Sequence, residues 1–466
     1  MVLQRNQPIR VWGRGVPGST LLVTLKNEAL RTQVKSDSTW LVTFTPLPAS
    51  TTGVSLQVQS EEQQLRFGNI LIGDVWICIG QSNMEWPLQR EQHWLQEKEE
   101  ANQPLIRFLN PSPAGRNVYN VSYNDSLLKR LHPANFYEWK EWAVATPTSL
   151  LNMSAVAYYF GKTLVKETGV PIGLIHLAIG GAPLESFIST ATLQSDTFFS
   201  KKINGDWRLN ESLPTWIRVR GKQNLDSVHY LYGDQWGPHH AYKPGFAYAS
   251  GIAPLQQQGV SGFLLYQGES NAEEEARVVE YRALSTLLID SYRSLWQNNR
   301  LPFYWVQLSS IQRPLWPFFR DEQRKLLDEI KYSGMAVTSD IGHPTDVHPR
   351  DKKTVGERLA RWALADIYHH RVIVSGPLAT RAWYKRGKIY IRFNYGADLH
   401  SSDGKPLRTF SVDSTHFINV QLKRNRVVIP CAIKPTYVFY GYQPYSEGNL
   451  VNKEGLPAST FKLAVH

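Results

Sequence analysis

A serine, a histidine and several carboxylates in this chain are of the types needed for nucleophilic catalysis. Ser82 follows the apolar run Val75 to Ile79, which is typical of a strand buried on both faces. A serine at the carboxyl end of such a strand can present its hydroxyl to a cleft, although it can equally cap the next segment. His348 shares a later segment with Asp340 and Asp346. That segment supplies a base for the serine and a carboxylate to orient the base.

Three apolar runs end in segments that offer hydrogen-bond donors. The donors are glycine N–H groups or side-chain amides, in Gly80–Asn83, Gly180–Gly181 and Gln267–Asn271. Because the carboxyl ends of parallel strands meet at one edge of a sheet, we expect these segments to lie together. Donors fixed where negative charge develops form an oxyanion hole. Each segment alone is a weak signal, and their shared position carries the interpretation.

The order of these segments resembles that of the SGNH (GDSL-like) hydrolases, and most closely the sialate O-acetylesterase family. The serine is not in the Gly-x-Ser-x-Gly elbow of α/β-hydrolases, because Met84 replaces the second glycine. The matching blocks extend over nearly the whole chain: Met1–Arg5, Gly80–Met84, Gly180–Glu185, Tyr266–Asn271, Val306–Leu308, Asp346–Pro349, Gly448–Asn452 and Gly455–Ser459.

This resemblance implies an α/β/α esterase that hydrolyses acetyl esters on sugars without a metal or another cofactor. It implies that Ser82 is the nucleophile, His348 the general base and Asp346 the residue that orients His348. The oxyanion would then be stabilised by the N–H groups of Ser82 and Gly181 and by an amide of Gln267 or Asn271. The resemblance also implies a secreted or periplasmic protein, and the abrupt start of the chain would fit a processed N-terminus.

One departure from the wider SGNH pattern leaves the acid open. The acid usually lies three residues before the histidine, where this chain has Thr345. Asp346 lies two before it, as in the sialate esterase branch, and Asp340 and Glu269 remain competitors.

Candidate substrate-binding residues are Gln81, Glu269, Trp316 and Arg320. Trp207, Trp216 and Trp236 are further candidate platforms for a sugar ring, although core packing explains any single tryptophan equally well. Arg313 and Arg320 flank Trp316, and either could bind a sialate carboxylate or simply be a surface charge.

The pattern of apolar runs predicts three regions. Residues 1–68 contain short alternating strands that favour a β-sandwich. In residues 69–372, strands alternate with helices, which indicates an α/β esterase domain with a parallel sheet; residues 189–245 break the alternation and predict an insertion over the cleft. Residues 373–466 return to short strands and predict a C-terminal β-rich region.

Composition, charge and cysteine spacing exclude several classes of function. The 466 residues carry a net charge of +11, but the basic residues are scattered and form no nucleic-acid motif. No apolar run is long enough to span a membrane, and no His/Cys cluster has zinc spacing. A disulfide between the two cysteines, Cys78 and Cys431, has no support from their spacing. The family resemblance implies an O-acetylated sugar as partner, and the composition leads us to expect no nucleic acid and no membrane. The preferred substrate is O-acetylated sialic acid; the alternatives are an acetylated neutral polysaccharide such as xylan, or a non-catalytic glycan-binding protein on an esterase scaffold.

Overall fold

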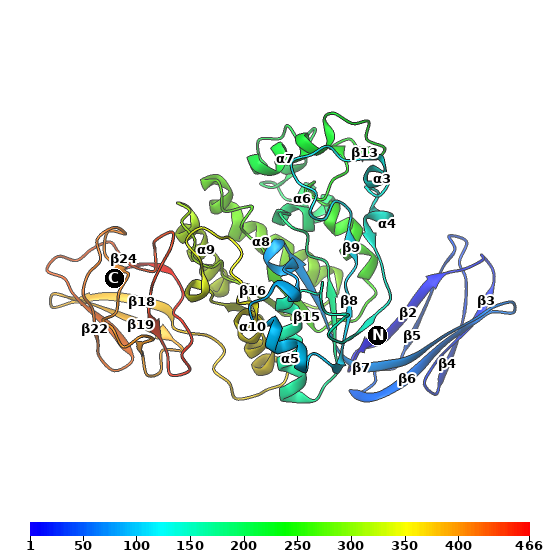
Figure 1. Ribbon diagram of the computed structural model, residues 1–466, viewed down its shortest axis with the longest axis horizontal. Coiled ribbons are helices and arrows are strands. Elements are labelled where there is room, and N and C mark those ends of the chain that lie inside the picture. Colours follow the sequence, from blue (N-terminus) through cyan, green and yellow to red (C-terminus); the bar gives the residue numbers. More distant parts are fainter.

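Strand β7 (Gln64–Gly80) runs through the centre of the molecule and is shared by two of its parts. The computed structural model describes residues 1–466 and shows a central sheet covered by helices, with a β-rich region at either end (Figure 1). The central sheet has the order β11-β8-β12-β7-β15-β16-β17. All of its pairs are parallel except that of β11 with β8. Its strands are β7, β8 (Gln103–Leu109), β11 (Ala143–Ala145), β12 (Ile172–His176), β15 (Gly262–Tyr266), β16 (Phe303–Val306) and β17 (Ser333–Ala336).

Helices cover both faces of this sheet. Tyr304 and Trp305 are neighbours in β16 and therefore point to opposite faces. Tyr304 donates to Asp366 of α10 (Lys352–Asp366), and Trp305 donates to the Gln323 carbonyl of α9 (Trp316–Glu329). Helix α5 (Ala155–Thr168) packs beside α10, and α8 (Glu275–Leu295) packs beside α9. The predicted α/β/α layering is confirmed.

The N-terminal region is a small sandwich with its own apolar core. One sheet pairs β2 (Ile9–Arg14) with β5 (Thr39–Phe44), and the other places β3 (Thr20–Leu25) between β4 (Glu28–Gln33) and β6 (Ser50–Gln59). The first half of β7 pairs with β6, and β1 (Val2–Gln4) pairs in parallel with Leu71–Gly73 of β7. The boundary predicted at residue 68 therefore falls inside one continuous strand.

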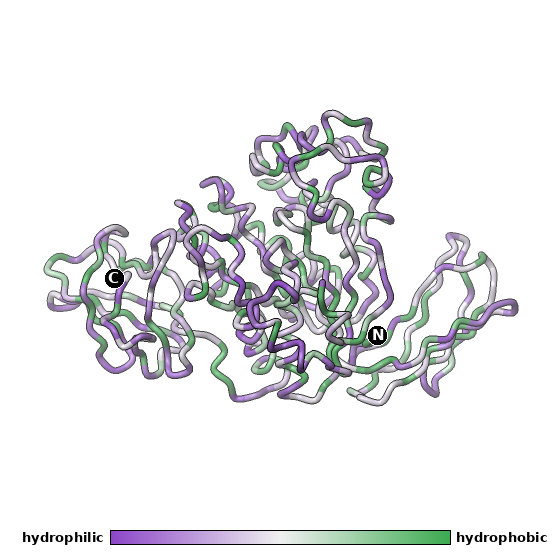
Figure 2. Tube along the Cα trace, in the orientation of Figure 1, coloured by the Kyte–Doolittle hydropathy of each residue, from purple (hydrophilic) through white to green (hydrophobic).

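The C-terminal region has a second separate core, formed by strands from residue 378 onward. Figure 2 shows hydrophobic stretches along the strands of all three regions. The C-terminal strands are β18 (Leu378–Lys385), β19 (Lys388–Asn394), β20 (His400–Ser401), β21 (Phe410–Ser411), β22 (Gln421–Leu422), β23 (Arg426–Pro430), β24 (Tyr437–Tyr440), β25 (Leu450–Val451) and β26 (Phe461–Ala464).

Residues 189–245 form a separate group of short elements, drawn in green at the top of Figure 1. They include α6 (Thr190–Ser195), α7 (Thr215–Leu225), β13 (Gly233–Asp234) and β14 (Gly237–Pro238). The remaining short elements are α1 (Ser82–Glu85), α2 (Trp94–Glu97), β9 (Ser112–Pro113), α3 (Asp125–Leu128), α4 (Pro133–Phe136) and β10 (Tyr137–Glu138). No helix has the length and apolar character needed to cross a bilayer. Both cysteines are free thiols.

Candidate active site

The central sheet presents Ser82 to a histidine from a distant loop. Ser82 is the first residue of α1, directly after β7. Gly80 makes this exit possible: its φ is +133°, and a Cβ there would lie 2.1 Å from the Tyr266 carbonyl oxygen of the neighbouring strand. His348 lies in the loop between β17 and α10. Its Nε2 is 2.8 Å from Ser82 Oγ, which is the contact that a base needs to take the serine proton.

The surroundings of His348 keep its imidazole neutral. Burial lowers its pKa to about 4, and the Lys352 ammonium adds to that effect while Asp346 opposes it. The Trp86 ring stacks on the imidazole with 5.3 Å between ring centroids. At neutral pH the Nε2 lone pair is therefore free to accept a proton.

Asp346 is the carboxylate that faces His348. Its Oδ1 accepts the backbone N–H of His348 at 2.8 Å and lies 3.7 Å from Nδ1, at ion-pair distance but beyond a hydrogen bond. Asp340 is engaged elsewhere, in a two-pronged pair with Arg358 at 2.7 and 2.6 Å. Glu269 accepts from Asn83 at 2.5 Å. Of the three acids considered, only Asp346 lies within ion-pair distance of the imidazole.

A buried polar cluster ties the serine segment to the histidine loop. Asn83, next to Ser82, donates through Nδ2 to the Val347 carbonyl at 3.0 Å and also to Glu269. Lys352 Nζ donates to Asn83 Oδ1 at 2.5 Å. Burial raises the pKa of Glu269 to about 7 and lowers that of Lys352 to about 7. Asn83 thus fixes the backbone just before His348.

The Gly180–Gly181 turn brings backbone donors beside Ser82. Ile179 N–H still donates to the Gly80 carbonyl at 3.0 Å, so the turn follows β7 to its end. Gly181 has φ +78°, and a Cβ there would lie 2.6 Å from both the Trp216 ring and the Tyr242 hydroxyl. The N–H groups of Ser82 and Gly181 have no acceptor in the protein. Two free donors are therefore available for a developing oxyanion.

The predicted amide donors Gln267 and Asn271 are used up inside the protein. Gln267 Nε2 donates to Asn271 Oδ1 at 2.7 Å, and Asn271 Nδ2 donates to Glu185 Oε2 at 2.9 Å. Neither residue lines the hollows around Ser82, which corrects their predicted position. Gln81 does line one: its Oε1 accepts the Ser270 N–H at 3.2 Å, and its Nε2 has no acceptor. Its place beside Ser82 in the Gly-Gln-Ser-Asn block was the available signal.

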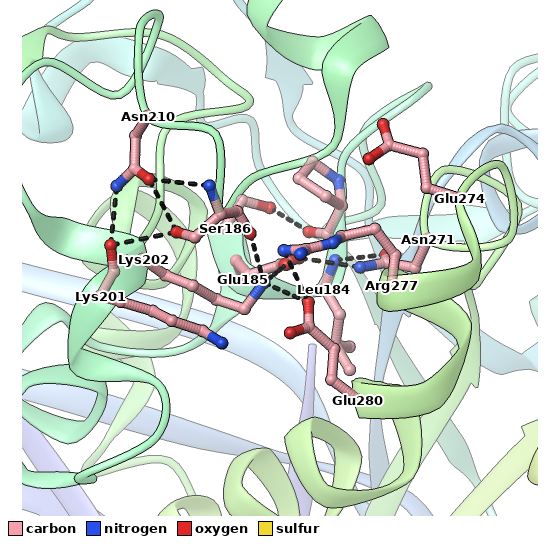
Figure 3. A network of polar contacts seen from close by, with 12 residues as sticks. Leu184, Glu185, Ser186, Lys201, Lys202, Asn210, Asn271, Glu274, Arg277 and Glu280 are labelled. Carbon is pink, nitrogen blue, oxygen red and sulfur yellow. Dashed lines mark hydrogen bonds and ion pairs between the residues drawn. The ribbon is translucent and has the colours of Figure 1, made fainter.

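Glu185 belongs to a buried charge network that anchors this side of the site (Figure 3). Lys202, which is fully buried, donates to Glu185 at 2.7 Å, to the Ser212 carbonyl at 3.0 Å and to Glu280 of α8. Burial would raise the pKa of Glu185, but Lys202 and Asn271 together hold it below its usual value. The network links the insertion, the segment after Gly181 and α8.

Two hollows meet at the Ser82–His348 pair, and both residues line each of them. One hollow, of about 770 Å³, is lined by Glu85, Trp86 and Arg116 among others. The other, of about 890 Å³, is lined by residues that include Gln81, Gly181, Trp216, Arg220, Glu269 and Arg313. The predicted insertion contributes Trp216 and Arg220, so it forms one wall of the site.

Trp316 and Arg320 do not reach either hollow, which corrects the prediction that they bind substrate. Trp316 is buried at the start of α9 and donates to the Ser309 carbonyl at 2.8 Å. Arg320 is fully buried and donates to carbonyls of the C-terminal region. Trp207 is buried against His240, whereas Arg313 lines the second hollow and pairs with Glu273. Trp316 and Arg320 lie on the buried face of α9, and therefore neither side chain reaches the hollows.

Glu91, His93 and Asp351 are the residues whose ligand atoms could hold a metal ion, since these atoms lie within 4.8 Å of one another. They already have protein partners: Tyr159 donates to Glu91 at 3.0 Å, and Asp351 accepts from Thr354 at 2.9 Å. None of the three lines the hollows at Ser82.

Comparisons with known proteins agree with this fold. Residues 234–365 match the family model of the carbohydrate esterases described as sialic acid-specific acetylesterase. The sialate O-acetylesterases of Pongo abelii and Homo sapiens are each 29% identical over 416 residues, covering 81% of this chain and 71% of theirs. The crystal structure of a carbohydrate acetylesterase from Xanthomonas citri superposes with a TM-score of 0.79 at 29% identity, covering 99% of this chain and 96% of that one.

By its fold and these likenesses the chain is a carboxylic ester hydrolase that is similar to the carbohydrate esterases. Within that class its likeness is to the sialate O-acetylesterases, and the resemblance predicted from the motifs is confirmed.

Proposed function

We propose that this protein is a serine esterase that removes O-acetyl groups from sugars through Ser82 and His348. The observation that carries the proposal is the 2.8 Å contact between Ser82 Oγ and His348 Nε2 where two hollows meet. Oγ attacks the acetyl carbonyl carbon while Nε2 takes its proton. The oxyanion receives hydrogen bonds from the N–H groups of Ser82 and Gly181, and Gln81 Nε2 is the third donor.

The second half of the reaction reuses the same base. His348 returns its proton to the sugar oxygen, which leaves as the free hydroxyl, and the acetyl group stays on Ser82 as an ester. Water then attacks that ester while His348 takes a proton from it. His348 passes this proton to Ser82 Oγ as the bond between Oγ and the acetyl carbon breaks, which releases acetate and restores the serine. Asp346 stabilises the imidazolium that forms in each half.

O-acetylated sialic acid is the substrate that we propose. The names of the two mammalian relatives and the basic net charge of +11 support it. An acetylated neutral polysaccharide is the second candidate, because the Xanthomonas citri structure that matches nearly the whole chain is described only as a carbohydrate acetylesterase. We further infer that the protein acts outside the cytoplasm, as a secreted or periplasmic enzyme; cell fractionation with an antibody tests this.

Replacing the nucleophile tests the mechanism. Because no other group can form the acyl-enzyme, Ser82→Ala should lower kcat for p-nitrophenyl acetate by on the order of a million-fold. Circular dichroism and a urea titration confirm that the variant is folded. Assays of the wild type with and without EDTA should agree, since no step uses a metal. Near-normal turnover by the folded variant would contradict the serine mechanism. A wild type inactive on every acetyl ester would favour the glycan-binding alternative.

A further inference from the structure

We propose that Arg220 binds the carboxylate of an acidic sugar while its acetyl group lies at Ser82. The inference rests on the proposed esterase function and names the feature that selects an acidic substrate. Arg220 lies in helix α7 of the insertion and lines the same hollow as Ser82, Gly181 and His348. A sugar held there with its ester at Ser82 can therefore reach the guanidinium with another substituent.

The other charged groups of that hollow already have partners. Arg313 pairs with Glu273, Glu274 accepts the Thr215 N–H at 2.5 Å, and Glu269 accepts from Asn83. Arg220 is the cation of this hollow that has no protein partner: its Nη1 is buried without a hydrogen-bond partner, and it forms no ion pair. Glu269 Oε2 is also buried without a partner, but a carboxylate oxygen does not attract an anion. A buried guanidinium nitrogen without an acceptor is costly, so this position calls for an anion from outside the protein.

The aromatic neighbours of Arg220 hold its guanidinium in place. Its central carbon lies 5.3 Å from the centroid of the Tyr119 ring and 5.9 Å from that of the Trp216 ring. Contacts with ring faces fix the guanidinium but do not satisfy its N–H groups. A fixed planar fork matches the two oxygens of a carboxylate and not an uncharged hydroxyl.

The first hollow offers no buried cation without a partner. Its Arg116 forms an ion pair with the buried Glu85 at 2.7 Å, and its other two cations, Arg90 and Lys140, are exposed to solvent. The acidic group of the substrate is therefore directed to the side of the site that the insertion covers.

A matched pair of substrates tests Arg220. kcat/KM is measured for O-acetylated sialic acid and for its methyl ester, which keeps the acetyl group and the ring but lacks the charge. The wild type should prefer the acid, and Arg220→Gln should reduce the acid-to-ester ratio of kcat/KM by about 10- to 100-fold, the size expected for a lost charge-assisted bond. Arg220→Lys keeps the charge but not the planar fork, so its acid-to-ester ratio should lie between those of the wild type and Arg220→Gln. Lys222→Gln is the control, because it removes an exposed charge from the same helix.

Two results would overturn the inference: a wild type that treats acid and methyl ester alike, or an Arg220→Gln variant that keeps the wild-type ratio or loses both activities equally. Hydrolysis of p-nitrophenyl acetate separates these from failure of the proposed function. If wild type cleaves it and Ser82→Ala does not, the serine esterase stands whatever the ratio shows.

Discussion

At the scale of single residues, the pKa of His348, the proposed base, is set by what surrounds its ring. Burial against Trp86 and the nearby Lys352 charge both favour the neutral imidazole, and only Asp346 favours the charged one. The base is active when neutral, so activity is present above the His348 pKa and is lost as pH falls through it. The enzyme should therefore tolerate mildly acid conditions.

The acid limb of the pH profile should lie well below the usual histidine value. We expect kcat/KM to stay nearly constant from pH 7 downward and to fall near the His348 pKa of about 4. Lys352→Met removes a cation that lowers this pKa, so the fall in kcat/KM should begin at a higher pH. This shift is expected even if the variant's maximal kcat/KM also changes. Lys353→Met, on the neighbouring residue, is the control. A wild-type limb near the ordinary histidine pKa, or no shift in Lys352→Met, would contradict this account.

We expect Asp346 to be the acid that orients His348. Its contribution to kcat should be reduced because it lies beyond hydrogen-bond distance of the imidazole. Because Oδ1 is 3.7 Å from Nδ1 and the carboxylate is partly exposed, Asp346→Asn should lower kcat by about 100- to 10,000-fold. Asp340→Asn breaks only the pair with Arg358 and should change kcat by less than about 10-fold. Single-turnover kinetics of both, with Glu269→Gln alongside, ranks the acids. A larger loss in Glu269→Gln or Asp340→Asn would assign the role to that residue instead.

The sequence made some of these residues predictable and not others. Ser82 could be found because an apolar run leads straight into Gly-Gln-Ser-Asn, and His348 because Asp-Val-His follows another such run. The side-chain partners could not be found, because Gln267 and Asn271 have the right chemistry and only their contacts show that their donors are occupied. Arg220 carried no local signal: it becomes significant only when α7 folds over the site.

At the scale of elements, continuous apolar runs predicted the buried strands well. The apolar runs at 20–25 and 262–266 coincide with β3 and β15 residue for residue. The largely apolar run over 172–179 is a strand only as far as His176, because Leu177 to Ile179 are bonded to β7 on one side only. Helix α9 was missed, although Pro317 at its start is a recognised helix signal.

Contacts between elements could not be predicted from the sequence. Lys202 lies 17 residues from Glu185 and 78 residues from Glu280, and no sequence pattern pairs the three in advance. Their network nevertheless decides which way Asn271 points, because Glu185 takes its amide. This contact between elements explains why the side-chain amides of Gln267 and Asn271 do not point toward Ser82.

At the scale of the whole molecule, the end regions are fastened to the esterase domain by buried polar contacts. In the N-terminal region, Gln4 and Arg5 both donate to Asp74 of β7, each at 3.0 Å. In the C-terminal region, Arg320 donates to the carbonyls of Gly441 and Gln443 at 2.9 and 2.6 Å. Both accessory regions are therefore joined to the domain that carries the site.

The C-terminal contact reaches the histidine loop through a chain of hydrogen bonds. The Ile311 N–H donates to the Pro444 carbonyl at 3.3 Å, and Ser310 Oγ donates to the Ser446 carbonyl, also at 3.3 Å. The Ser310 carbonyl in turn accepts the His343 N–H at 3.1 Å, five residues before His348. Loosening residues 441–446 should therefore loosen the segment that positions the base.

Arg320→Met tests this coupling. The variant removes the Arg320 hydrogen bonds from the carbonyls of Gly441, Gln443 and Pro444 and leaves the Gln443 carbonyl without a donor, so the free energy of unfolding should fall by about 3 kcal/mol or more. Hydrogen exchange should rise in residues 441–446 and also in 309–313 and 343–348, with kcat lowered by about 10-fold at a temperature where the variant is folded. Arg392→Met, on an exposed face of β19, should change none of these. Exchange confined to residues 441–446, with kcat unchanged, would show that the C-terminal region is an independent appendage.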